Sequence, residues 1–394
     1  MKILFIASWY PTAKNHYSGI FVKEHAKAAR NTGNEVTVLA IVVHRCSCLW
    51  RKRITDSIDE NGIRTVLIEI DTCFRDVVYH AIPLQYRIVK NYVKNDLLNS
   101  FSPDLIHSNV VFPAGIIGDK LAQNLGIPHI VTEHWSQLRK FLKKPLFSQM
   151  GINVYNNAAR ILPVSEYLKQ EIIDSVGGTI PVDKFRVIGN VVDSRIFKYK
   201  TKTLCEDEIR ICTIGTWNNT RNITKRPELL IEAISIIQTE FDKKIKLTMV
   251  GGGNRLDELK ELCRTKSVAA NFTGYLNSIE VATLLHSSDY MAHCSNVETF
   301  GIVVAEALMT GTPVICSNTG ALIELMAEER GVVKGVTCEN TLSDWLHKLK
   351  IAFLWRFDNE SIAKEIGDKY SLDAISAELG EVYDELFCQI KKMD

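Results

Sequence analysis

The sequence predicts an α/β protein made of two Rossmann-like domains, each built on a parallel sheet. With 394 residues, the chain is longer than one hydrophobic core usually serves, so two domains are expected. A strand, a helix and a second strand open the chain between residues 2 and 43, and the same order recurs between residues 290 and 316. Strands that alternate with helices form parallel sheets, which bind ligands at the carboxyl ends of their strands.

Composition places the chain among ordinary globular proteins. Hydrophobic residues make up 46% and charged residues 24%, which is typical of a folded domain. The ten cysteines are scattered and include no Cys-x-x-Cys pair, which argues against a zinc ribbon or a redox motif. We interpret them as reduced core residues of a cytosolic protein, and Cys46 and Cys48 stay open to a reactive-thiol role.

The sequence predicts a cytoplasmic protein with a basic first half. The opening apolar stretch is too short for the core of a signal peptide, and no later stretch approaches a membrane span. Residues 1–170 carry 21 Lys and Arg against 13 Asp and Glu, although the net charge of the chain is only +1. This asymmetry predicts an anionic partner for the first half: nucleic acid, a phosphorylated acceptor or a membrane surface.

The first 43 residues predict a βαβ unit without a dinucleotide-binding turn. Residues 2–7 predict a buried strand, residues 21–30 a helix and residues 35–43 a second strand. A long loop from Ser8 to Ser18 precedes Gly19. It contains no Gly-x-Gly-x-x-Gly sequence, which argues against dinucleotide binding.

Residues 44–100 are less regular. We expect a basic loop at residues 50–53, a strand at residues 65–70 and a helix at residues 84–98. Glu69 and Asp71 are spaced like a metal-binding acidic pair, but carboxylates at the end of a strand are more often solvated, and we favour that interpretation.

A histidine marks the carboxyl edge of the first predicted sheet. The strand pattern at residues 129–132 ends in Glu133 and His134, so His134 is expected at the edge where ligands bind. Its imidazole could donate a hydrogen bond to a developing charge. A lone histidine is more often structural, but the loop position favours function for His134, whereas for His107 we favour the structural interpretation. The other patterns here predict strands at residues 104–107, 158–164 and 185–192 and helices at 114–125 and 165–176.

The segment from Arg139 to Phe147 interleaves four cations with four apolar side chains. Such a segment suits an anionic bilayer surface, with the apolar residues inserted shallowly and the lysines near the head groups. A solvated basic loop explains it equally well, and both interpretations stay open.

The second domain restarts after a charged passage at residues 198–208. Lys225 and Arg226 stand directly before Pro227, a residue that suits the first position of a helix. Cations ahead of a helix N-terminus suit a diphosphate, and a solvated loop is the alternative for Lys225. The patterns predict strands at residues 209–215 and 247–250 and helices at 227–237, from 256, at 339–352 and at 372–391.

Two glutamates interrupt the apolar segment between residues 290 and 316. Glu298 lies in the loop before a predicted helix at residues 300–309, and Glu306 lies inside this helix among apolar residues. An ionised carboxylate in such surroundings is costly unless it is hydrogen-bonded, and the vicinal hydroxyls of a ribose would do so. On spacing alone, it is equally open that Glu298 caps the helix and Glu306 pairs with a nearby Lys or Arg.

The start of the same helix suits an anion. The amides of Thr299, Phe300 and Gly301 have no intrahelical acceptors and carry the positive end of the helix dipole, which favours phosphate or sugar oxygens. Gly301 allows a ligand to approach the backbone closely. The three glycines at residues 251–253, after another strand, permit a similar approach.

These motifs resemble a known family. Glu298-Thr-Phe-Gly, followed by Glu306-Ala and Gly311-Thr-Pro-Val, resembles the two-glutamate signature of family 4 of the retaining glycosyltransferases, which have the GT-B fold. The resemblance extends over most of the chain. It implies an acceptor-binding domain at residues 1–193, a nucleotide-sugar-binding domain at residues 194–371, an interdomain cleft, and a terminal helix at 372–394 that packs back onto the first domain.

The resemblance also implies roles for single residues. Glu298 would lie against the donor sugar, Glu306 would hold the ribose hydroxyls, and His134 would approach the reacting sugar or its phosphates. The family arginine after the strand glycine is replaced by Thr216, for which Arg221 or Arg226 could substitute. The residues implied to bind the donor are Gly19, Lys225, Arg226, Gly251, Gly253, Tyr275, Glu298, Thr299, Phe300, Gly301, Ile302 and Glu306.

The expected reaction moves a hexosyl unit from a nucleoside diphosphate sugar to a saccharide or lipid-linked saccharide, with retention at the anomeric carbon. We expect no metal and no cofactor besides this cosubstrate, because Lys225, neighbouring arginines and a helix start can neutralise the diphosphate. An epimerase, a phosphorylase and a non-catalytic sugar-nucleotide-binding or membrane-adaptor protein remain alternatives. Nucleic-acid binding is the least supported, because the cations form no recognition motif.

Overall fold

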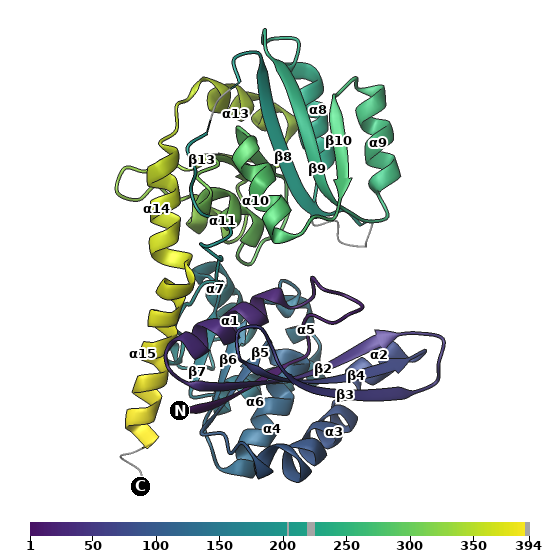
Figure 1. The fold of residues 1–394 in the computed structure, drawn as a ribbon, viewed down its shortest axis with the longest axis vertical. Coiled ribbons are helices and arrows are strands. Elements are labelled where there is room, and N and C mark those ends of the chain that lie inside the picture. The colour runs from purple at the N-terminus through teal and green to yellow at the C-terminus, as the bar shows by residue number, and fades with distance from the viewer. Residues whose placement is uncertain (203–204, 219–224, 391–394) are drawn as a thin grey trace. The chain divides into compact units, whose positions relative to one another are not determined.

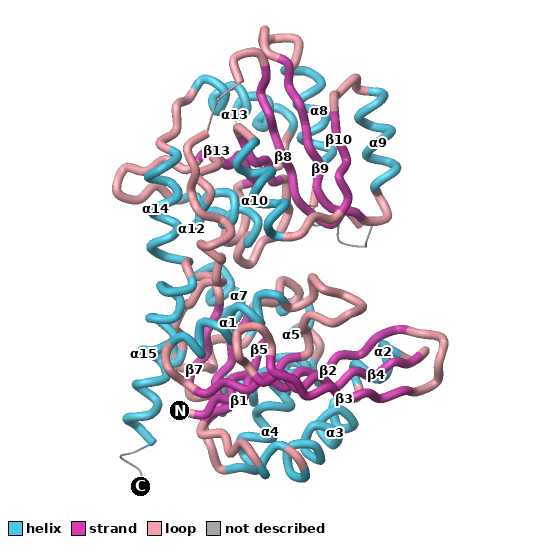
Figure 2. Tube along the Cα trace, in the orientation of Figure 1, coloured by secondary structure: helices cyan, strands magenta, loops and turns pink. Residues whose placement is uncertain are grey.

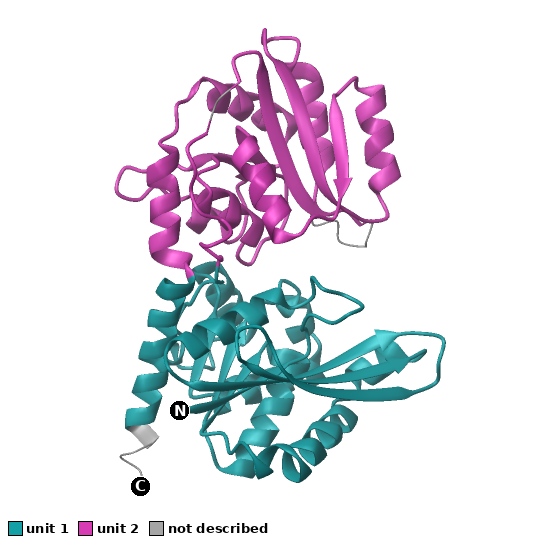
Figure 3. Cartoon of the chain, in the orientation of Figure 1, with its two compact units in different colours: residues 1–191, 372–394 teal, residues 192–371 magenta. Residues whose placement is uncertain are grey.

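The computed structural model describes residues 1–202, 205–218 and 225–390, which divide into two compact units (Figure 3). Unit 1 comprises residues 1–191 and the end of the chain from residue 372, and unit 2 comprises residues 192–371. The division lies two residues before the boundary expected between residues 193 and 194.

Unit 1 is built on a sheet that has seven strands within the described residues, in the order β3-β4-β2-β1-β5-β6-β7. All neighbouring strands are parallel except β3 and β4. The strands are β1 (Lys2–Ala7), β2 (Glu35–Arg45), β3 (Arg51–Ile58), β4 (Arg64–Thr72), β5 (Leu105–Asn109), β6 (His129–Glu133) and β7 (Arg160–Pro163). The helices are α1 (Ile20–Asn31), α2 (Arg75–His80), α3 (Ile82–Asn95), α4 (Ile116–Leu125), α5 (Leu138–Leu142), α6 (Pro145–Asn157), α7 (Glu166–Ser175) and α15 (Leu372–Ile390), with short turns at Leu97–Asn99, Val111–Gly115 and Val182–Lys184. Figure 1 shows α1 on one side of the sheet and α3 and α4 on the other.

The strand patterns at the centre of this sheet are confirmed, and three expectations at its margins are wrong. Residues 51–53 belong to β3, an exposed edge strand that pairs antiparallel with β4, and not to a loop. Residues 139–142 lie in α5 and residues 145–147 in α6, so the alternative of a solvated loop over residues 139–147 is wrong for most of the segment. Residues 185–192 form no strand, and Phe185 makes only an isolated bridge to Ile161.

Unit 2 holds a fully parallel sheet of six strands within the described residues, in the order β10-β9-β8-β11-β12-β13 (Figure 2). The strands are β8 (Glu208–Thr216), β9 (Lys244–Gly252), β10 (Ala270–Gly274), β11 (Tyr290–His293), β12 (Val314–Ser317) and β13 (Gly335–Cys338). The helices are α8 (Pro227–Ile237), α9 (Leu256–Thr265), α10 (Ser278–Ser287), α11 (Ile302–Met309), α12 (Leu322–Met326), α13 (Leu342–Leu354) and α14 (Asn359–Tyr370). The sequence predicted a strand, a loop, a helix and a second strand between residues 290 and 316. This prediction is confirmed, because the structure has β11, α11 and β12 there.

The C-terminal helix α15 is part of unit 1. Asn31 of α1 donates hydrogen bonds to Asp373 at 3.2 Å and to Ser376 at 3.1 Å. Deeper in the unit, the hydroxyl of Tyr383 lies 2.9 Å from Nδ1 of His107, and both side chains are buried. The chain leaves unit 1 and returns to it at neighbouring backbone positions, because the amide of Val192 donates to the carbonyl of Tyr370 at 2.8 Å.

Two further expectations concern composition. Cys212, Cys263, Cys294, Cys316 and Cys338 are buried, but the other five cysteines are at least partly exposed, so the core interpretation holds for half of them. Among the described residues, none of the helices combines the length and the apolar character that crossing a bilayer requires.

Replacing Tyr383 with phenylalanine is expected to lower the free energy of unfolding by about 1 to 3 kcal/mol, because the buried Nδ1 of His107 loses its hydrogen-bond partner. Urea-induced unfolding measures this change. Tyr86→Phe is the control: its hydroxyl accepts from Asn124 at an exposed site, so the expected change is below about 0.5 kcal/mol. Equal effects of the two substitutions would contradict the anchoring role of Tyr383.

Candidate functional site

In the sheet of unit 2, the order in which the chain adds strands reverses between the neighbouring strands β8 and β11. From β8 the chain continues outward to β9 and β10, and it then returns to β11, β12 and β13 on the other side. The loops that follow β8 and β11 therefore diverge, and open parallel sheets bind their ligands at such a point. The loop after β8 leads to Lys225, and the loop after β11 contains Glu298.

Backbone pairing brings these two loops together. Lys225 forms an isolated antiparallel bridge with Ser295, and the amide of Arg226 donates to the carbonyl of Cys294 at 3.0 Å. The ammonium group of Lys225 consequently makes an ion pair with Oε1 of Glu298. Nε2 of His293, the last residue of β11, lies 2.6 Å from the same oxygen and 3.1 Å from Nζ of Lys225.

This cluster keeps Glu298 ionised. Burial raises the pKa of its carboxyl, but the positive charge of Lys225 and the hydrogen bond with His293 outweigh burial, so the pKa lies well below its usual range. Burial and the charge of Lys225 lower the pKa of His293, which favours the neutral imidazole. The structure thus brings together Lys225 and Glu298, two residues that the resemblance implies for donor binding, and adds His293.

Glu306 lies eight residues further along, in opposite surroundings. In α11 the side chains of Val304, Ala305 and Leu308 are fully buried, whereas Glu306 is half-buried. Its carboxylate has no hydrogen bond or ion pair with any side chain among the described residues. Burial alone raises its pKa to about 8. The pairing of Glu306 with a neighbouring Lys or Arg, which the sequence left open, is therefore not observed in the described part of the chain.

At the start of α11, backbone amides are better placed than side chains to contact a ligand. Phe300 is buried and packs edge-on against Tyr370, with ring centroids 5.1 Å apart. Gly301 is the N-cap of α11, with a φ of 84°, and Ile302 is half-buried on the same helix face as Glu306. Thr299 is half-buried beside Glu298. Any contact of Phe300 with a ligand would thus go through its amide.

The glycines at the end of β9 and directly after it fit closely against the protein itself. A Cβ atom on Gly251 would lie 1.9 Å from the carbonyl oxygen of Gly215, and one on Gly253 would lie 2.1 Å from that of Trp217. Both positions therefore need glycine to accommodate the backbone at the end of β8 and just after it. The ring of exposed Tyr275 lies against Gly252. Contact of Gly251, Gly253 and Tyr275 with a nucleotide stays a prediction.

The cation beside Lys225 is engaged by a carboxylate. Arg226 pairs with Glu228 through its Nε at 3.0 Å. Glu228 also pairs with the buried Arg255, which follows the glycine loop and further pairs with Glu258. Arg221, the other candidate for the missing family arginine, lies outside the described residues.

In unit 1, the two predicted residues lie on loops that are in contact with each other. Gly19 is the N-cap of α1, with a φ of 68°, and a Cβ atom there would lie 2.2 Å from the carbonyl oxygen of Trp9. Its helix neighbour Phe21 packs against His134, with ring centroids 4.4 Å apart. His134 is buried, and its Nε2 lies 3.2 Å from Oδ1 of Asn109. Burial lowers the pKa of His134 well below its usual value.

Sequence reasoning missed the group that holds the His134 loop. The buried carboxylate of Glu133 accepts hydrogen bonds from the amides of Val111, His134 and Trp135 at 2.9 to 3.0 Å and from the hydroxyl of Tyr155 at 3.1 Å. Burial raises its pKa to about 7. The same reasoning missed His293, although a histidine that ends a buried strand five residues before Glu298 was a usable signal.

The acidic pair on β4 serves ion pairing. Asp71 pairs with Lys14 and Arg51, and Glu69 pairs with His44 and Arg53. Both carboxylates are buried, so the expectation of a solvated loop is wrong. Among the described residues, no group of three or more His, Cys, Asp or Glu side chains could hold a metal ion.

Comparison with known families identifies two matches that together span most of the chain. Residues 18–195 match the family described as Glycosyltransferase Family 4, and residues 202–354 match the family described as Glycosyl transferases group 1.

Relatives and solved structures agree with these matches. An uncharacterised glycosyltransferase of Methanocaldococcus jannaschii is 24% identical over 79% of this chain and 86% of its own length. A Bacillus subtilis glycosyltransferase assigned to teichuronic acid biosynthesis is 24% identical over 90% of this chain and 91% of its own length. Sucrose-phosphate synthase from Thermosynechococcus elongatus has the same fold, with a TM-score of 0.78 and 17% identity over 99% of this chain and 100% of that one. Anabaena HepE in complex with UDP-glucose has a TM-score of 0.70 and 17% identity over 98% of this chain and 100% of that one.

The isolation of Glu306 predicts a pH-dependent stability. Because burial raises its pKa from 4.5 to about 8, the folded chain holds this proton more tightly than the unfolded chain. The resulting stabilisation is complete below about pH 4.5 and is lost as the pH rises through about 8. Glu306→Gln stays neutral, so its melting temperature should rise relative to that of the parent protein as the pH increases from about 5 to about 9.

Thermal unfolding of the ligand-free proteins across this pH range measures the effect. Glu360→Gln, at an exposed position of α14, is the control and should follow the parent protein at every pH. A pH-independent difference for Glu306→Gln would contradict the raised pKa.

Proposed function

The chain belongs to family 4 of the glycosyltransferases and has the GT-B fold, and on this basis we propose that it moves a hexosyl unit from a nucleoside diphosphate sugar to an acceptor hydroxyl with retention at the anomeric carbon. The acceptor is a saccharide or a lipid-linked saccharide, and the reaction serves polysaccharide or glycolipid assembly on the cytoplasmic side of a membrane.

The observation that carries the proposal is the surroundings of Glu306. A carboxylate on an otherwise apolar helix, with no partner among the described residues and with a raised pKa, lacks the hydrogen bonds that buried charges normally have. A ribose offers two adjacent hydroxyl donors, which fit the two oxygens of one carboxylate. Binding of the nucleotide would thus supply the missing hydrogen bonds.

Positive charge for the diphosphate is available from the protein itself. The ammonium group of Lys225 and the amides at the start of α11 lie at the carboxyl edge of the sheet, next to Glu298. A helix start and a lysine together stabilise phosphate oxygens. We therefore propose that the leaving diphosphate is neutralised without a metal ion.

Glu298 is proposed to lie against the donor sugar. It is ionised, and Lys225 and His293 fix its position through one oxygen, Oε1. The second oxygen can accept a hydrogen bond from a sugar hydroxyl. On unit 1, Gly19 and His134 are proposed to complete the reacting site, with the neutral imidazole of His134 donating a hydrogen bond to the sugar or its phosphates.

Relatives support the substrate classes. HepE was crystallised with UDP-glucose, the Bacillus subtilis relative is assigned to teichuronic acid biosynthesis, and a Streptococcus pneumoniae relative, 22% identical over 59% of this chain, is an alpha-monoglucosyldiacylglycerol synthase. Membrane contact by residues 139–147 stays a prediction. Two of the four apolar side chains in that segment, Phe141 and Leu142, are buried in unit 1, while Leu146 is exposed.

Glu306→Gln and Glu298→Gln should separate nucleotide binding from transfer. Glu306→Gln is expected to weaken nucleoside diphosphate binding by about 10- to 100-fold, because the amide has one oxygen instead of two and leaves a ribose hydroxyl without an acceptor, which costs about 1 to 3 kcal/mol. Glu298→Gln should change that affinity little but lower the rate of transfer by about 100-fold or more.

Isothermal titration calorimetry with UDP, ADP and GDP measures the first effect, and turnover of the matching nucleotide sugar measures the second. Glu360→Gln again serves as the control. Unchanged nucleotide affinity in Glu306→Gln would count against the assignment of the ribose to this residue, and undiminished transfer in Glu298→Gln against the role of that carboxylate.

A further inference from the structure

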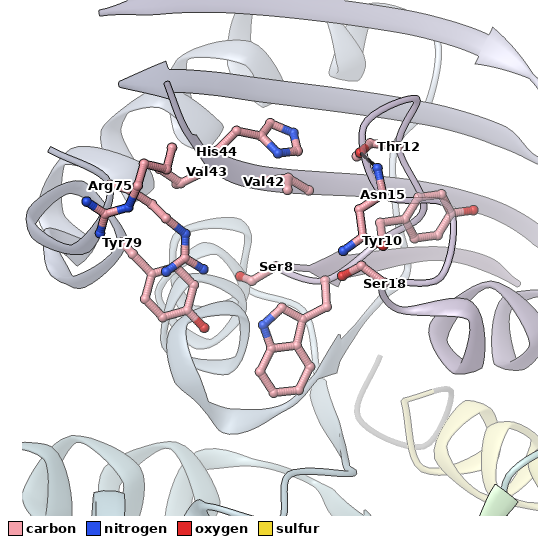
Figure 4. Close-up of a pocket in the computed structure, with 12 residues that line it drawn as sticks. Ser8, Tyr10, Thr12, Asn15, Ser18, Val42, Val43, His44, Arg75 and Tyr79 are labelled. Atoms are coloured by element: carbon pink, nitrogen blue, oxygen red, sulfur yellow. Dashed lines mark hydrogen bonds between the residues drawn. The ribbon is translucent and has the colours of Figure 1, made fainter. Parts of the chain in front are cut away.

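A pocket lies entirely within unit 1, at the carboxyl ends of β1 and β2. Its volume is about 210 Å³. The loop after β1 contributes Ser8 and Trp9, the end of β2 contributes His44 and Arg45, and α2 contributes Arg75 and Tyr79. Figure 4 shows Ser8 between the side of the pocket formed by Arg75 and Tyr79 and the side formed by the loop after β1.

We propose that this pocket recognises a negatively charged group, a carboxylate or a phosphate, on the saccharide acceptor. The inference rests on the proposed transferase function and narrows its acceptor to an anionic sugar. The family matches assign no role to this pocket, and the candidate site described above does not include it.

The first argument is an excess of positive charge around the pocket. Among the described residues that line it, His44, Arg45 and Arg75 are basic and none is an Asp or Glu. The carboxylates of Glu69 and Asp76 pair with these basic side chains but do not line the pocket. An anionic ligand would reduce this imbalance, whereas a cationic ligand would increase it.

The second argument is the arrangement of the two arginines that line the pocket. Arg45 and Arg75 come from different elements and converge on Asp76, which binds one terminal nitrogen of each. A guanidinium has five N–H donors in a planar fork, so a single carboxylate does not saturate the pair. The side chains of Asp76 and Arg45 are 63% and 61% exposed, which allows an incoming anion to compete in solvent.

The third argument is an unsatisfied hydroxyl. Ser8 lines the pocket and is 6% exposed, and its Oγ has no hydrogen-bond partner among the described residues. A buried hydroxyl without a partner is costly, so a ligand that supplies one gains binding energy there. The hydroxyls of a sugar ring supply both donors and acceptors.

The fourth argument is the aromatic side of the pocket. Trp9 and Tyr79 line it, and the guanidinium of Arg75 lies 5.4 Å from the ring centroid of Tyr79. This cation–π contact restrains the Arg75 side chain beside the Tyr79 ring. Aromatic surface beside a few convergent polar groups is typical of small-molecule sites, and a charged rim adds selectivity for an anion.

Three monosaccharides test the proposal: methyl α-glucuronide, glucose 6-phosphate and the neutral methyl α-glucoside. Their binding to the full chain is measured by calorimetry or by ligand-observed NMR. At least one anionic sugar should bind about tenfold or more tightly than the neutral glycoside, and the preference should weaken as salt is added. The comparison of the first two probes distinguishes a uronate from a phosphate.

Four variants locate the binding. Arg45→Gln and Arg75→Gln should each weaken binding of the anionic sugar at least about tenfold without affecting the neutral glycoside. Asp76→Asn should strengthen it, because the competing carboxylate is removed. Ser8→Ala should weaken anionic and neutral sugars alike.

Arg87→Gln, at an exposed position of α3, is the matched control and should change nothing. Equal affinity for charged and neutral sugars, or unchanged affinity in Arg45→Gln, Arg75→Gln and Asp76→Asn, would overturn the inference. Hydrolysis of nucleotide sugars by the same variants reports on the proposed function separately, because it needs no acceptor.

Discussion

The ion pair between Lys225 and Glu298 is the interaction on which the candidate site depends. It joins the loops that follow β8 and β11, although the two residues lie 73 positions apart in the sequence. It also lowers the pKa of Glu298, while Glu306 in the adjacent helix has a pKa raised to about 8. Two carboxylates that are held in opposite protonation states by their surroundings are suited to different tasks.

The sheets of the two units each contain a point at which the strand order reverses. In unit 1 the sheet changes direction between β1 and β5, and in unit 2 between β8 and β11. Gly19 follows β1, Lys225 follows β8 and Glu298 follows β11, while Asn109, the partner of His134, ends β5. The candidate residues thus cluster where the loops of a parallel sheet diverge, and their chemistry follows from strand order.

Much of this arrangement could be predicted from the sequence because buried parallel strands are continuous apolar runs. The segments that formed β1 and β11 had this pattern, and the polar residues after them mark the edge of each sheet. The strand β3 could not be predicted in this way, because its residues are exposed throughout and show no apolar alternation. Its pairing with β4 alone makes it a strand.

Contacts between distant segments explain the remaining errors. Phe141 appeared available for a membrane, but it packs against Phe112, with ring centroids 4.5 Å apart, which no local pattern could indicate. The burial of Glu69 and Asp71 depends on basic partners from other elements. His293 gains its meaning only when Lys225 and Glu298 are placed beside it. Local pattern fixes elements, whereas partners depend on tertiary structure.

The position of α15 has a consequence for the order in which the chain folds. Unit 2 is continuous in sequence, but unit 1 is interrupted and receives its last helix only from residue 372 onward. During synthesis, the surface of unit 1 that surrounds His107 therefore lacks Tyr383 until all residues of unit 2 have been made. Unit 1 begins first along the chain but receives its last helix only after unit 2, so unit 2 can fold before unit 1 is complete.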